Sequence, residues 1–562
     1  MKTDRLIQEV KAETSHLLIS KEIAPIHLAG YQAYLDTGNR LSFEGEYFAR
    51  RKQVATLALA LQFEGDHSAI VQLLEEAIWE ICNEYSWALP AHLPLTEDKQ
   101  YGADSPKTID LFAAETAQTL AEILEIYPNH FSNLLRNRVE SEIESRVWEP
   151  FETRTWDWEF KENNWSAVIA GSIGMSVLSL MEKGSARQVN IINRLETSFE
   201  YYLKSFKQDG VCLEGVSYWV YGFGYYLYFA EKYQDVYEDT RFLKDPLLKE
   251  IAAFPFRAQI GDQRFLPFSD AQETGILPSG LLSFCHDYYA VPVPYCDTAP
   301  SLDFDHCYRW AHLYRNLTWT KPISKTKENT QHYFPDTEWL VLNDQGIIFA
   351  AKGGRNDDSH NHNDVGHFIL GAGETLFLTD LGAGEYTRDY FIEETRYNFL
   401  QNRSKGHSVP IINECEQVAG NVGATQVTKT DTATGFTFKM NLEDVYDEQA
   451  KLNTFQRSFT WDSETTTLSL SDWFNFQTKE QQLIQENFIS YIRPTLSGQS
   501  VSWKTASHTL ILTTEKDVTL AIIEESIKKH DGERALVYRL LLSYSENTRD
   551  IHCRYDFKIE RK

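Results

Sequence analysis

The chain has 562 residues, 42% of them hydrophobic, and a formal net charge of −27 at pH 7. Single hydrophobic cores stop growing at about 250 to 300 residues, so this length predicts at least two domains. The acidic excess argues against a nucleic-acid partner and against an anionic membrane surface, because binding to phosphates requires clustered lysine and arginine.

Apolar residues recur at helical spacing from about residue 47 to 320. The clearest segments span residues 47–62, 69–85, 108–127 and 166–181. In each segment apolar side chains return every three or four residues, which is typical of amphipathic or buried helices. Proline, asparagine and glycine separate the segments, as expected between hairpinned helices. This part of the chain predicts a helical bundle or an α/α barrel.

The pattern changes to short β-rich runs from about residue 335. These runs alternate apolar and polar residues and are separated by turn residues, which indicates antiparallel sheet. They cover residues 338–343, 346–351, 367–373, 375–380, 435–441, 467–476, 509–514 and 518–525. A polar, proline-containing linker at 317–335 separates the two halves. We therefore predict a multidomain protein with a helical domain over 1–325 and a β-sandwich domain over 326–562.

The densest cluster of ligand-type residues runs from Gly353 to His367, just before one of the predicted strands. If this segment is extended, His360, His362 and Asp364 point to the same side, because alternate residues of a strand share a face. Two histidines at that spacing can divide their roles, with one binding a metal and the other meeting substrate.

A metal would need further ligands, and imidazole combined with carboxylate favours zinc or a similar divalent ion. Asp380 closes the next predicted strand, and His407 follows in a short Gly-His-Ser segment. The alternative for any single histidine is a loop residue that hydrogen-bonds to the backbone. Three histidines within eight residues make that alternative weaker for the group.

These motifs resemble those of the heparinase II/III-like polysaccharide lyases. The resemblance rests on the order and spacing of Ser359–Phe368, Leu378–Gly382 and Gly406–Ser408. It implies an N-terminal α/α toroid, which is an incomplete barrel, followed by an antiparallel β-sandwich, and this architecture spans nearly the whole chain. It agrees with the independent reading of the helical and β-rich segments.

The resemblance also implies roles for individual residues. One structural divalent ion, with zinc as the first choice and manganese or calcium as alternatives, would be held by His362, Asp380 and His407. His360 would face the substrate. A tyrosine after the metal-binding aspartate would line the active site, and the spacing does not decide between Tyr386 and Tyr390.

The helical half supplies further candidates on the same resemblance. Asn163 or Asn164 would neutralise the substrate carboxylate, and Tyr218 is the first choice for the catalytic tyrosine. Substrate-binding candidates in this half are Trp165, Glu214 and Tyr221. In the β-rich half, recognition of sulfate would need basic side chains, and Arg355 and Arg388, together with Arg396 and Arg403, lie near the histidine motif. The alternatives stay open, because an asparagine can be a simple helix cap and a tyrosine in an aromatic stripe can be a core residue.

The predicted activity is cleavage of a uronic-acid-containing glycan, most naturally a glycosaminoglycan, by β-elimination. His360 and Tyr218 would act as base and acid in either order. One competing hypothesis is an α/α-barrel glycoside hydrolase with Glu214 and Asp209 as its carboxylates, and another is a non-catalytic glycan-binding protein. The charged start and the absence of a run of about 18 apolar residues predict a cytoplasmic protein.

Overall fold

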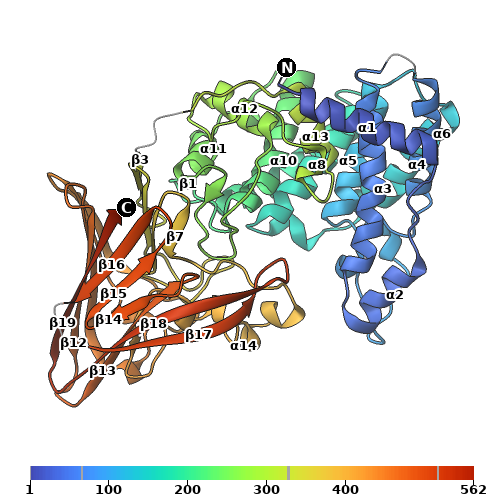
Figure 1. Cartoon of the computed structure of the whole chain (residues 1–562). Coiled ribbons are helices and arrows are strands. Elements are labelled where there is room, and N and C mark those ends of the chain that lie inside the picture. The colour runs from blue at the N-terminus through green and yellow to red at the C-terminus, as the bar shows by residue number, and fades with distance from the viewer. Residues whose placement is uncertain (1, 65–66, 326–329, 515–517) are drawn as a thin grey trace. The chain divides into compact units, whose positions relative to one another are not determined.

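The computed structural model describes residues 2–64, 67–325, 330–514 and 518–562 (Figure 1). A helical region is followed along the chain by antiparallel β-sheets, which confirms the predicted fold class. Contacts divide the chain into two compact units, and each is described by itself. The helical unit comprises Met1–Gly210, Tyr218–Ala253 and Ile276–Lys325, and the β unit comprises Val211–Ser217, Phe254–Gly275 and Thr326–Lys562.

Two short segments thus belong to the β unit although the predicted boundary near residue 325 would place them with the helices. Aromatic packing explains this difference for the second segment. The ring centroid of Phe268 lies 5.2 Å from that of Trp339, and the ring centroid of Phe254 lies 6.5 Å from that of Phe334. Phe334 lies in the strand Thr330–Phe334 and Trp339 lies in the strand Trp339–Asp344, and both strands belong to the β unit.

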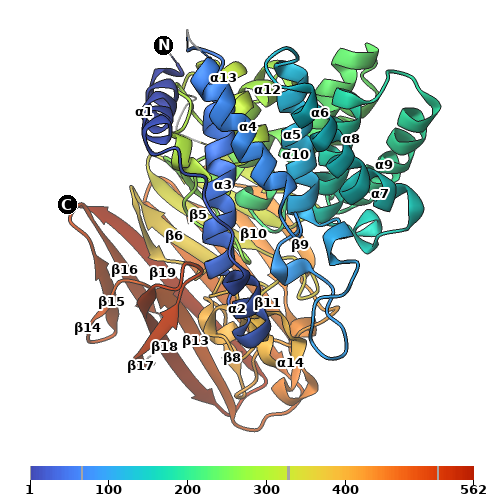
Figure 2. The ribbon, with the colours of Figure 1, turned by 90° about the vertical axis from the view of Figure 1, so that its right-hand side faces the viewer.

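The helices of the first unit follow the predicted amphipathic segments closely (Figure 2). Segments 47–62, 69–85, 108–127 and 166–181 correspond to α3, α4, α5 and α8. The helices are α1 (Asp4–Ser20), α2 (Leu28–Thr37), α3 (Leu41–Ala60), α4 (Ser68–Cys82), α5 (Leu111–Ile126), α6 (Asn133–Ile143), α7 (Glu149–Thr153), α8 (Asn164–Leu180), α9 (Ala186–Lys204), α10 (Val216–Tyr237), α11 (Pro246–Arg257), α12 (Ser279–Tyr289) and α13 (Trp310–Thr318).

Local chemistry sets where these helices begin and how closely they pack. The Asp110 carboxylate accepts a hydrogen bond from the Ala113 backbone N–H at 2.7 Å, so it caps α5, which begins at Leu111. Helices α8 and α10 approach closely at Gly171, where an added Cβ would lie 2.6 Å from the Tyr225 carbonyl oxygen. A larger residue at 171 would force the two helices apart.

The helical unit buries a polar cluster around Glu115 of α5. The Tyr221 hydroxyl of α10 donates a hydrogen bond to the Glu115 carboxyl, and Arg309 Nε lies 3.4 Å from the same oxygen. The Arg309 guanidinium carbon also lies 4.2 Å from the centroid of the Tyr221 ring. Burial raises the pKa of Glu115 from 4.5 to about 7, although Arg309 and Tyr221 oppose this shift.

The β unit contains all the larger sheets, and every strand pair described in it is antiparallel. One sheet has the order β3 (Thr330–Phe334), β4 (Trp339–Asp344), β5 (Ile347–Lys352), β6 (Phe368–Ala372), β7 (Thr375–Leu378). A second has the order β17 (Thr519–Lys528), β18 (Arg534–Glu546), β13 (Gln482–Ser490), β8 (Ile411–Ile412). The largest has the order β14 (Thr495–Ser497), β15 (Ser500–Lys504), β16 (His508–Thr514), β19 (Asp550–Arg561), β12 (Thr467–Phe476), β11 (Leu452–Asp462), β10 (Gly435–Asn441), β9 (Thr425–Asp431). A small hairpin, β1 (Gln259–Gly261) with β2 (Arg264–Phe265), precedes them.

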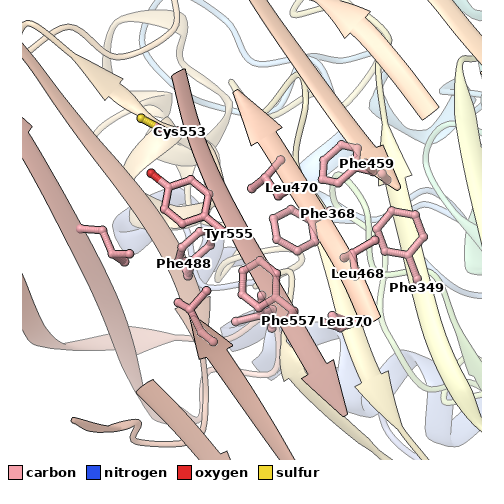
Figure 3. Packing of buried hydrophobic residues seen from close by; sticks show 14 of the residues in the cluster. Phe349, Phe368, Leu370, Phe459, Leu468, Leu470, Phe488, Cys553, Tyr555 and Phe557 are labelled. Atoms are coloured by element: carbon pink, nitrogen blue, oxygen red, sulfur yellow. The ribbon is translucent and has the colours of Figure 1, made fainter. Parts of the chain in front are cut away.

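A large hydrophobic core joins these sheets into a sandwich (Figure 3). Aromatic side chains from four strands meet in it: Phe368 of β6 lies between Phe459 of β11 and Phe557 of β19, at centroid distances of 5.2 and 5.8 Å, and Phe488 of β13 packs against Phe557 at 5.2 Å. Strand β12 shows the expected alternation, because its buried and partly exposed residues alternate along most of its length.

A buried cluster of charged residues lies beside this core. Arg457 of β11 is fully buried and donates hydrogen bonds to the carboxylates of Asp472 and Glu486. Its Nη1 also donates to the backbone carbonyl oxygens of Gly366 at 3.1 Å and Ser408 at 2.9 Å. A buried cation therefore ties the sandwich to the backbone beside two histidines of the sequence motifs.

In the described ranges, no helix combines the length and the apolar character needed to cross a membrane.

Glu115→Gln provides a test of the buried cluster in the helical unit. The pKa of Glu115 is higher in the folded chain than its ordinary 4.5, so the folded state holds a proton that the unfolded state releases first. The free energy of unfolding should therefore fall as pH rises from 4.5 to about 7. The glutamine variant should gain stability relative to the natural chain across that window, by up to about 3 kcal/mol.

Chemical denaturation at several pH values measures this difference. The exposed Glu76→Gln on α4 is the matched control, because its side chain is solvated and the substitution should leave the difference flat. A constant difference between Glu115→Gln and the natural chain from pH 4 to 8 would contradict the assignment.

Candidate active site

The segment that carries His360 and His362 is irregular, with turns or bends at residues 356–360 and 365–366 and no strand between them. The prediction that it is extended is wrong, because His360 adopts a left-handed conformation with φ of +54° and Gly366 has φ of +87°. His360 and His362 nevertheless converge, since both rings reach the same carboxylate, as described below. A turn therefore brings them together where an extended strand was expected.

Buried ligand-type side chains gather next to this segment. His362, Asp364 and His407 offer ligand atoms within 4.8 Å of one another, and so do His367, Asp380 and His407. His407 is common to both groups, and all five side chains are buried. The three predicted ligands are thus present, with His362 in one group and Asp380 in the other.

Hydrogen bonds determine which ring nitrogen of each predicted histidine ligand is free. Nε2 of His407 lies 2.7 Å from the Gln401 carbonyl oxygen, which can only accept, so this nitrogen carries the hydrogen. Nε2 of His362 lies 3.1 Å from Oδ1 of Asp270 and carries the hydrogen for the same reason. In the neutral form of each ring the lone pair is on Nδ1, and both Nδ1 atoms are buried without a hydrogen-bond partner. Burial opposes protonation of His407, but Asp380 and Asp364 raise its pKa above the ordinary value.

His367 has the opposite arrangement. Its Nδ1 accepts a hydrogen bond from the Ser408 backbone N–H at 2.8 Å, so the hydrogen of the neutral ring is on Nε2. That Nε2 faces Oδ2 of Asp380 at 3.3 Å. In this tautomer His367 presents a hydrogen and not a lone pair toward Asp380, although the geometry does not make a hydrogen bond between the two atoms.

Two buried carboxylates complete the cluster. Asp364 pairs through Oδ1 with the Lys352 ammonium at 2.7 Å, and Oδ1 of Asp380 accepts from the Gly382 N–H at 2.9 Å. The second oxygen of each lies near Nδ1 of His407, at 3.8 Å for Asp364 and 3.6 Å for Asp380. Burial alone would raise the pKa of Asp380, but His407 and His367 hold that pKa well below its ordinary value.

Asp270 is the hub of the polar residues beside this cluster. Its Oδ2 lies 2.7 Å from Nδ1 of His360, and its Oδ1 lies 3.1 Å from Nε2 of His362. The Tyr390 hydroxyl also donates to Oδ1, and Nη2 of Arg396 lies 3.5 Å from Oδ2. Burial would raise the pKa of Asp270, yet the hydrogen bonds from His360 and His362 hold it well below its usual range.

His360 is the histidine of the group that reaches the surface, with 24% of its side chain exposed. Its Nε2 lies 3.9 Å from Oε1 of Glu214, which also accepts a hydrogen bond from the Ser359 hydroxyl at 2.7 Å. Burial opposes protonation, but Asp270 and Glu214 raise the pKa of His360 above its ordinary value. Glu214 thus lies beside His360 and holds the turn that carries it.

The structure distinguishes the two tyrosines that the spacing left open. Tyr390 is fully buried, and its hydroxyl is held between Asp270 and Oδ1 of Asn402, the latter at 2.8 Å. Tyr386 is half-buried, and its ring stacks near the ring of His360 with centroids 6.5 Å apart. Tyr386 is therefore the more accessible of the two, and Tyr390 is a partner of Asp270.

The helical unit contains the remaining catalytic candidates. Asn163 caps α8, because its side-chain oxygen accepts from the Trp165 N–H at 3.1 Å, while Asn164 is the first residue of the helix. The half-buried Trp165 ring lies edge-on to His92, with centroids 5.0 Å apart. Tyr218 is half-buried near the start of α10. Whether these residues share one cleft with His360 stays a prediction.

Two arginines, Arg355 and Arg388, were predicted to bind substrate. Nε of Arg355 lies 2.9 Å from an oxygen of Asp357 in a solvent-exposed ion pair, so this guanidinium is already engaged. The side chain of Arg388 lies outside the part of the structure that is described. Arg396 is instead the arginine next to Asp270, and it also donates to the Asn361 carbonyl oxygen at 2.8 Å.

Sequence reasoning missed three residues of this site. Asp270 lies about 90 residues before the histidine motif, in a loop without a recognisable pattern. Asp364 and His367 were inside the motif, and the alternation argument grouped Asp364 with the histidines without assigning it as a ligand. The density of histidine, asparagine and aspartate in residues 353–367 is the feature of the sequence that could have identified Asp364 and His367 as site residues.

Comparison of the sequence with protein-family models finds no match, and comparison with curated proteins finds none either. Comparison of the fold with solved structures does find similar chains. Heparan sulfate lyase HepC from Pedobacter heparinus aligns with 98% of this chain and 88% of its own, at a TM-score of 0.63 and 11% identity. A heparinase III structure aligns over 99% of this chain and 92% of its own, at a TM-score of 0.61 and 13% identity.

A chondroitin AC lyase from Streptomyces coelicolor A3 is a more distant neighbour. It aligns with 99% of this chain and 79% of its own, at a TM-score of 0.54 and 10% identity. At these identities the alignments establish the fold and not the activity. The chain therefore has the fold of the heparinase-like polysaccharide lyases, with a helical toroid followed by an antiparallel β-sandwich.

Proposed function

We propose that this chain is a polysaccharide lyase that cleaves a uronate-containing glycan of the glycosaminoglycan type by β-elimination. The observation that carries the proposal is the hydrogen bond between Asp270 and Nδ1 of His360, beside a buried histidine and aspartate cluster. The fold supports it, because the similar structures are named as heparan sulfate and chondroitin lyases.

The reaction requires two proton transfers. A base removes the proton on C5 of the uronate, the electron pair forms the C4–C5 double bond, and the bond from C4 to the leaving oxygen breaks. An acid then protonates that oxygen. Because the carboxylate next to C5 already carries a negative charge, the site must also stabilise the developing enolate.

His360 is suited to one of the two transfers. Its Nδ1 hydrogen is held by Asp270, so the neutral ring presents a lone pair on Nε2, the nitrogen that lies toward Glu214. Its side chain is partly exposed, which a group that meets substrate requires. Tyr218, also half-buried, is the proposed partner, and the two exchange roles according to whether the reaction is syn or anti.

Asn163 or Asn164 is the proposed group that neutralises the substrate carboxylate. The side-chain oxygen of Asn163 caps α8, which leaves its amide nitrogen able to donate, and Asn164 begins the helix beside Trp165. The amide hydrogens of an asparagine can donate to a carboxylate and strengthen as charge develops, as preorganised donors do at an oxyanion site.

We further propose that the buried cluster binds one divalent ion, with zinc as the first choice. The fit rests on four buried atoms that lack a hydrogen-bond partner in the described ranges: Nδ1 of His362 and His407, and Oδ2 of Asp364 and Asp380. Two imidazoles and two carboxylates are a donor set that zinc accepts. Bound there, the ion would act structurally, fixing the turn that carries His360.

The activity itself is tested by incubating the protein with heparan sulfate, chondroitin sulfate, hyaluronan and alginate. We expect at least one of them to yield products with the ultraviolet absorbance of a C4–C5 unsaturated uronate. New reducing ends without this absorbance would identify a hydrolase, and binding without any product would identify a glycan-binding protein. Either result would overturn the proposal.

Tyr218→Phe tests the helical side of the site. Loss of the hydroxyl removes one proton-transfer group, so kcat should fall by about 10² to 10⁴-fold with little change in stability. Tyr226→Phe is the matched control on the same helix, since the buried Tyr226 hydroxyl donates to the Phe242 carbonyl oxygen at 2.8 Å. If the control loses as much turnover as Tyr218→Phe, the assignment of Tyr218 is wrong.

His407→Ala tests the metal proposal without using activity. Elemental analysis should find about one divalent ion per natural chain and much less in the variant. The variant should also melt at a lower temperature, because binding to a folded site stabilises the fold. His552→Ala, an exposed histidine on β19, should keep both properties. Equal metal content and equal melting temperature in the natural chain and His407→Ala would exclude His407 as a ligand.

A further inference from the structure

We propose that Asp270 is a positioning residue that fixes the orientation and the tautomer of both His360 and His362, and so couples the metal cluster to the proposed catalytic histidine. This inference rests on the proposed function for the role of His360. It does not depend on which glycan is the substrate.

The first step is the sharing of one carboxylate by two rings. Oδ2 of Asp270 lies 2.7 Å from Nδ1 of His360, and Oδ1 lies 3.1 Å from Nε2 of His362. A buried ionised carboxylate only accepts hydrogen bonds, so each facing nitrogen must carry a hydrogen. The same group therefore selects opposite tautomers in two histidines that are two residues apart.

The second step is where the unprotonated nitrogen of each neutral ring then points. With its hydrogen on Nε2, His362 has its lone pair on Nδ1, the buried atom in the group formed with Asp364 and His407. With its hydrogen on Nδ1, His360 has its lone pair on Nε2, on the side of Glu214. The tautomer of His362 thus places a lone pair in the buried cluster, and the tautomer of His360 places one on the side of Glu214. A metal-binding histidine commonly donates its second nitrogen to a carboxylate in this way.

The third step is that the surroundings hold both partners of these bonds. His360 has φ of +54°, a conformation that costs energy in a residue other than glycine, and Arg396 donates to the carbonyl of Asn361 between the two histidines. The loop of Asp270 is held equally closely. An added Cβ on Gly215 would lie 2.4 Å from the Ala271 Cβ, and one on Gly382 would lie 2.6 Å from the Ala271 carbonyl oxygen.

Direct roles for Asp270 agree less well with the contacts. Its two oxygens already receive bonds from His360, His362 and Tyr390, so neither is directed at the buried cluster as a ligand. Its side chain is fully buried, so it does not reach a polysaccharide as a base. The role of Asp270 that agrees with these contacts is to orient His360 and His362.

The experiment begins with the natural chain in its metal-free form, using ¹⁵N-labelled histidine and NMR to assign the ring tautomers. We expect His360 to carry its hydrogen on Nδ1 and His362 to carry it on Nε2. A natural chain with His360 protonated on Nε2 alone, or His362 on Nδ1 alone, would overturn the proposal. This measurement needs no variant.

Asp270→Asn then tests the coupling in a side chain of the same shape. An amide offers one accepting oxygen and one donating nitrogen, so it can preserve the tautomer of at most one of the two rings. We expect at least one tautomer to change, zinc affinity to fall by about 10 to 100-fold, and any measured turnover to fall by a similar factor.

Glu214→Gln is the control for zinc affinity, because Glu214 is the other carboxylate near His360 and touches no ring of the buried cluster. It should leave zinc affinity unchanged. If Asp270→Asn retains both tautomers and natural zinc affinity, Asp270 is not the positioning residue. A natural chain that makes no unsaturated product would instead refute the proposed function, and the NMR and zinc results would still decide the role of Asp270.

Discussion

The β unit depends on how it compensates charge that is removed from water. Arg457 lies in the sandwich core and pairs with Asp472, and Lys352 pairs with Asp364. Arg457 also donates to Glu486, whose pKa is raised well above its ordinary value by burial and by Asp472. Removing one partner of such a buried pair leaves an uncompensated charge, at a typical cost of about 3 to 5 kcal/mol. Each of these ion pairs also reaches the site: Arg457 holds the carbonyl groups of Gly366 and Ser408, and Asp364 belongs to the histidine cluster. The stability of the sandwich and the geometry of the site are therefore not separable.

The same constraint explains why the site is assembled from separate loops. Asp270, the turn around His360, Asp380 and His407 come from four different segments of the β unit. Each buried polar group in them needs partners that its own segment cannot supply, since a short turn offers few donors and acceptors at fixed positions. His407 obtains its partner from Gln401, His367 from Ser408, and His362 from Asp270. Such a network orders every loop only when all of its members are in place.

The sequence predicts the elements better than it predicts the network. Periodicity identified α4 and β12 because burial of one face gives a regular spacing of apolar residues along the chain, and the dense histidine motif revealed the site. No local pattern marks Asp270 in the sequence, because its partners lie about 90 and 120 residues away. The extended reading of residues 360–364 was wrong for a related reason. Alternation of side chains assumes a regular extended backbone. In the structure the backbone at His360 is left-handed, and the His360 and His362 rings both bind the Asp270 carboxylate.

The arrangement of carboxylates bears on the choice between elimination and hydrolysis. A glycosidase needs two carboxyl groups that are free to meet a glycosidic bond and an attacking water or the sugar itself. In the β unit, the Asp270 carboxylate is saturated by His360, His362 and Tyr390, and the Glu214 carboxylate holds Ser359 beside His360. Asp270 thus holds the rings of His360 and His362, and Glu214 holds the turn that carries His360. The hydrolase hypothesis paired Glu214 with Asp209 of the helical unit, and of these two Glu214 is already hydrogen-bonded to Ser359. On the proposed function, proton transfer on the β-unit side of the site falls to the His360 imidazole.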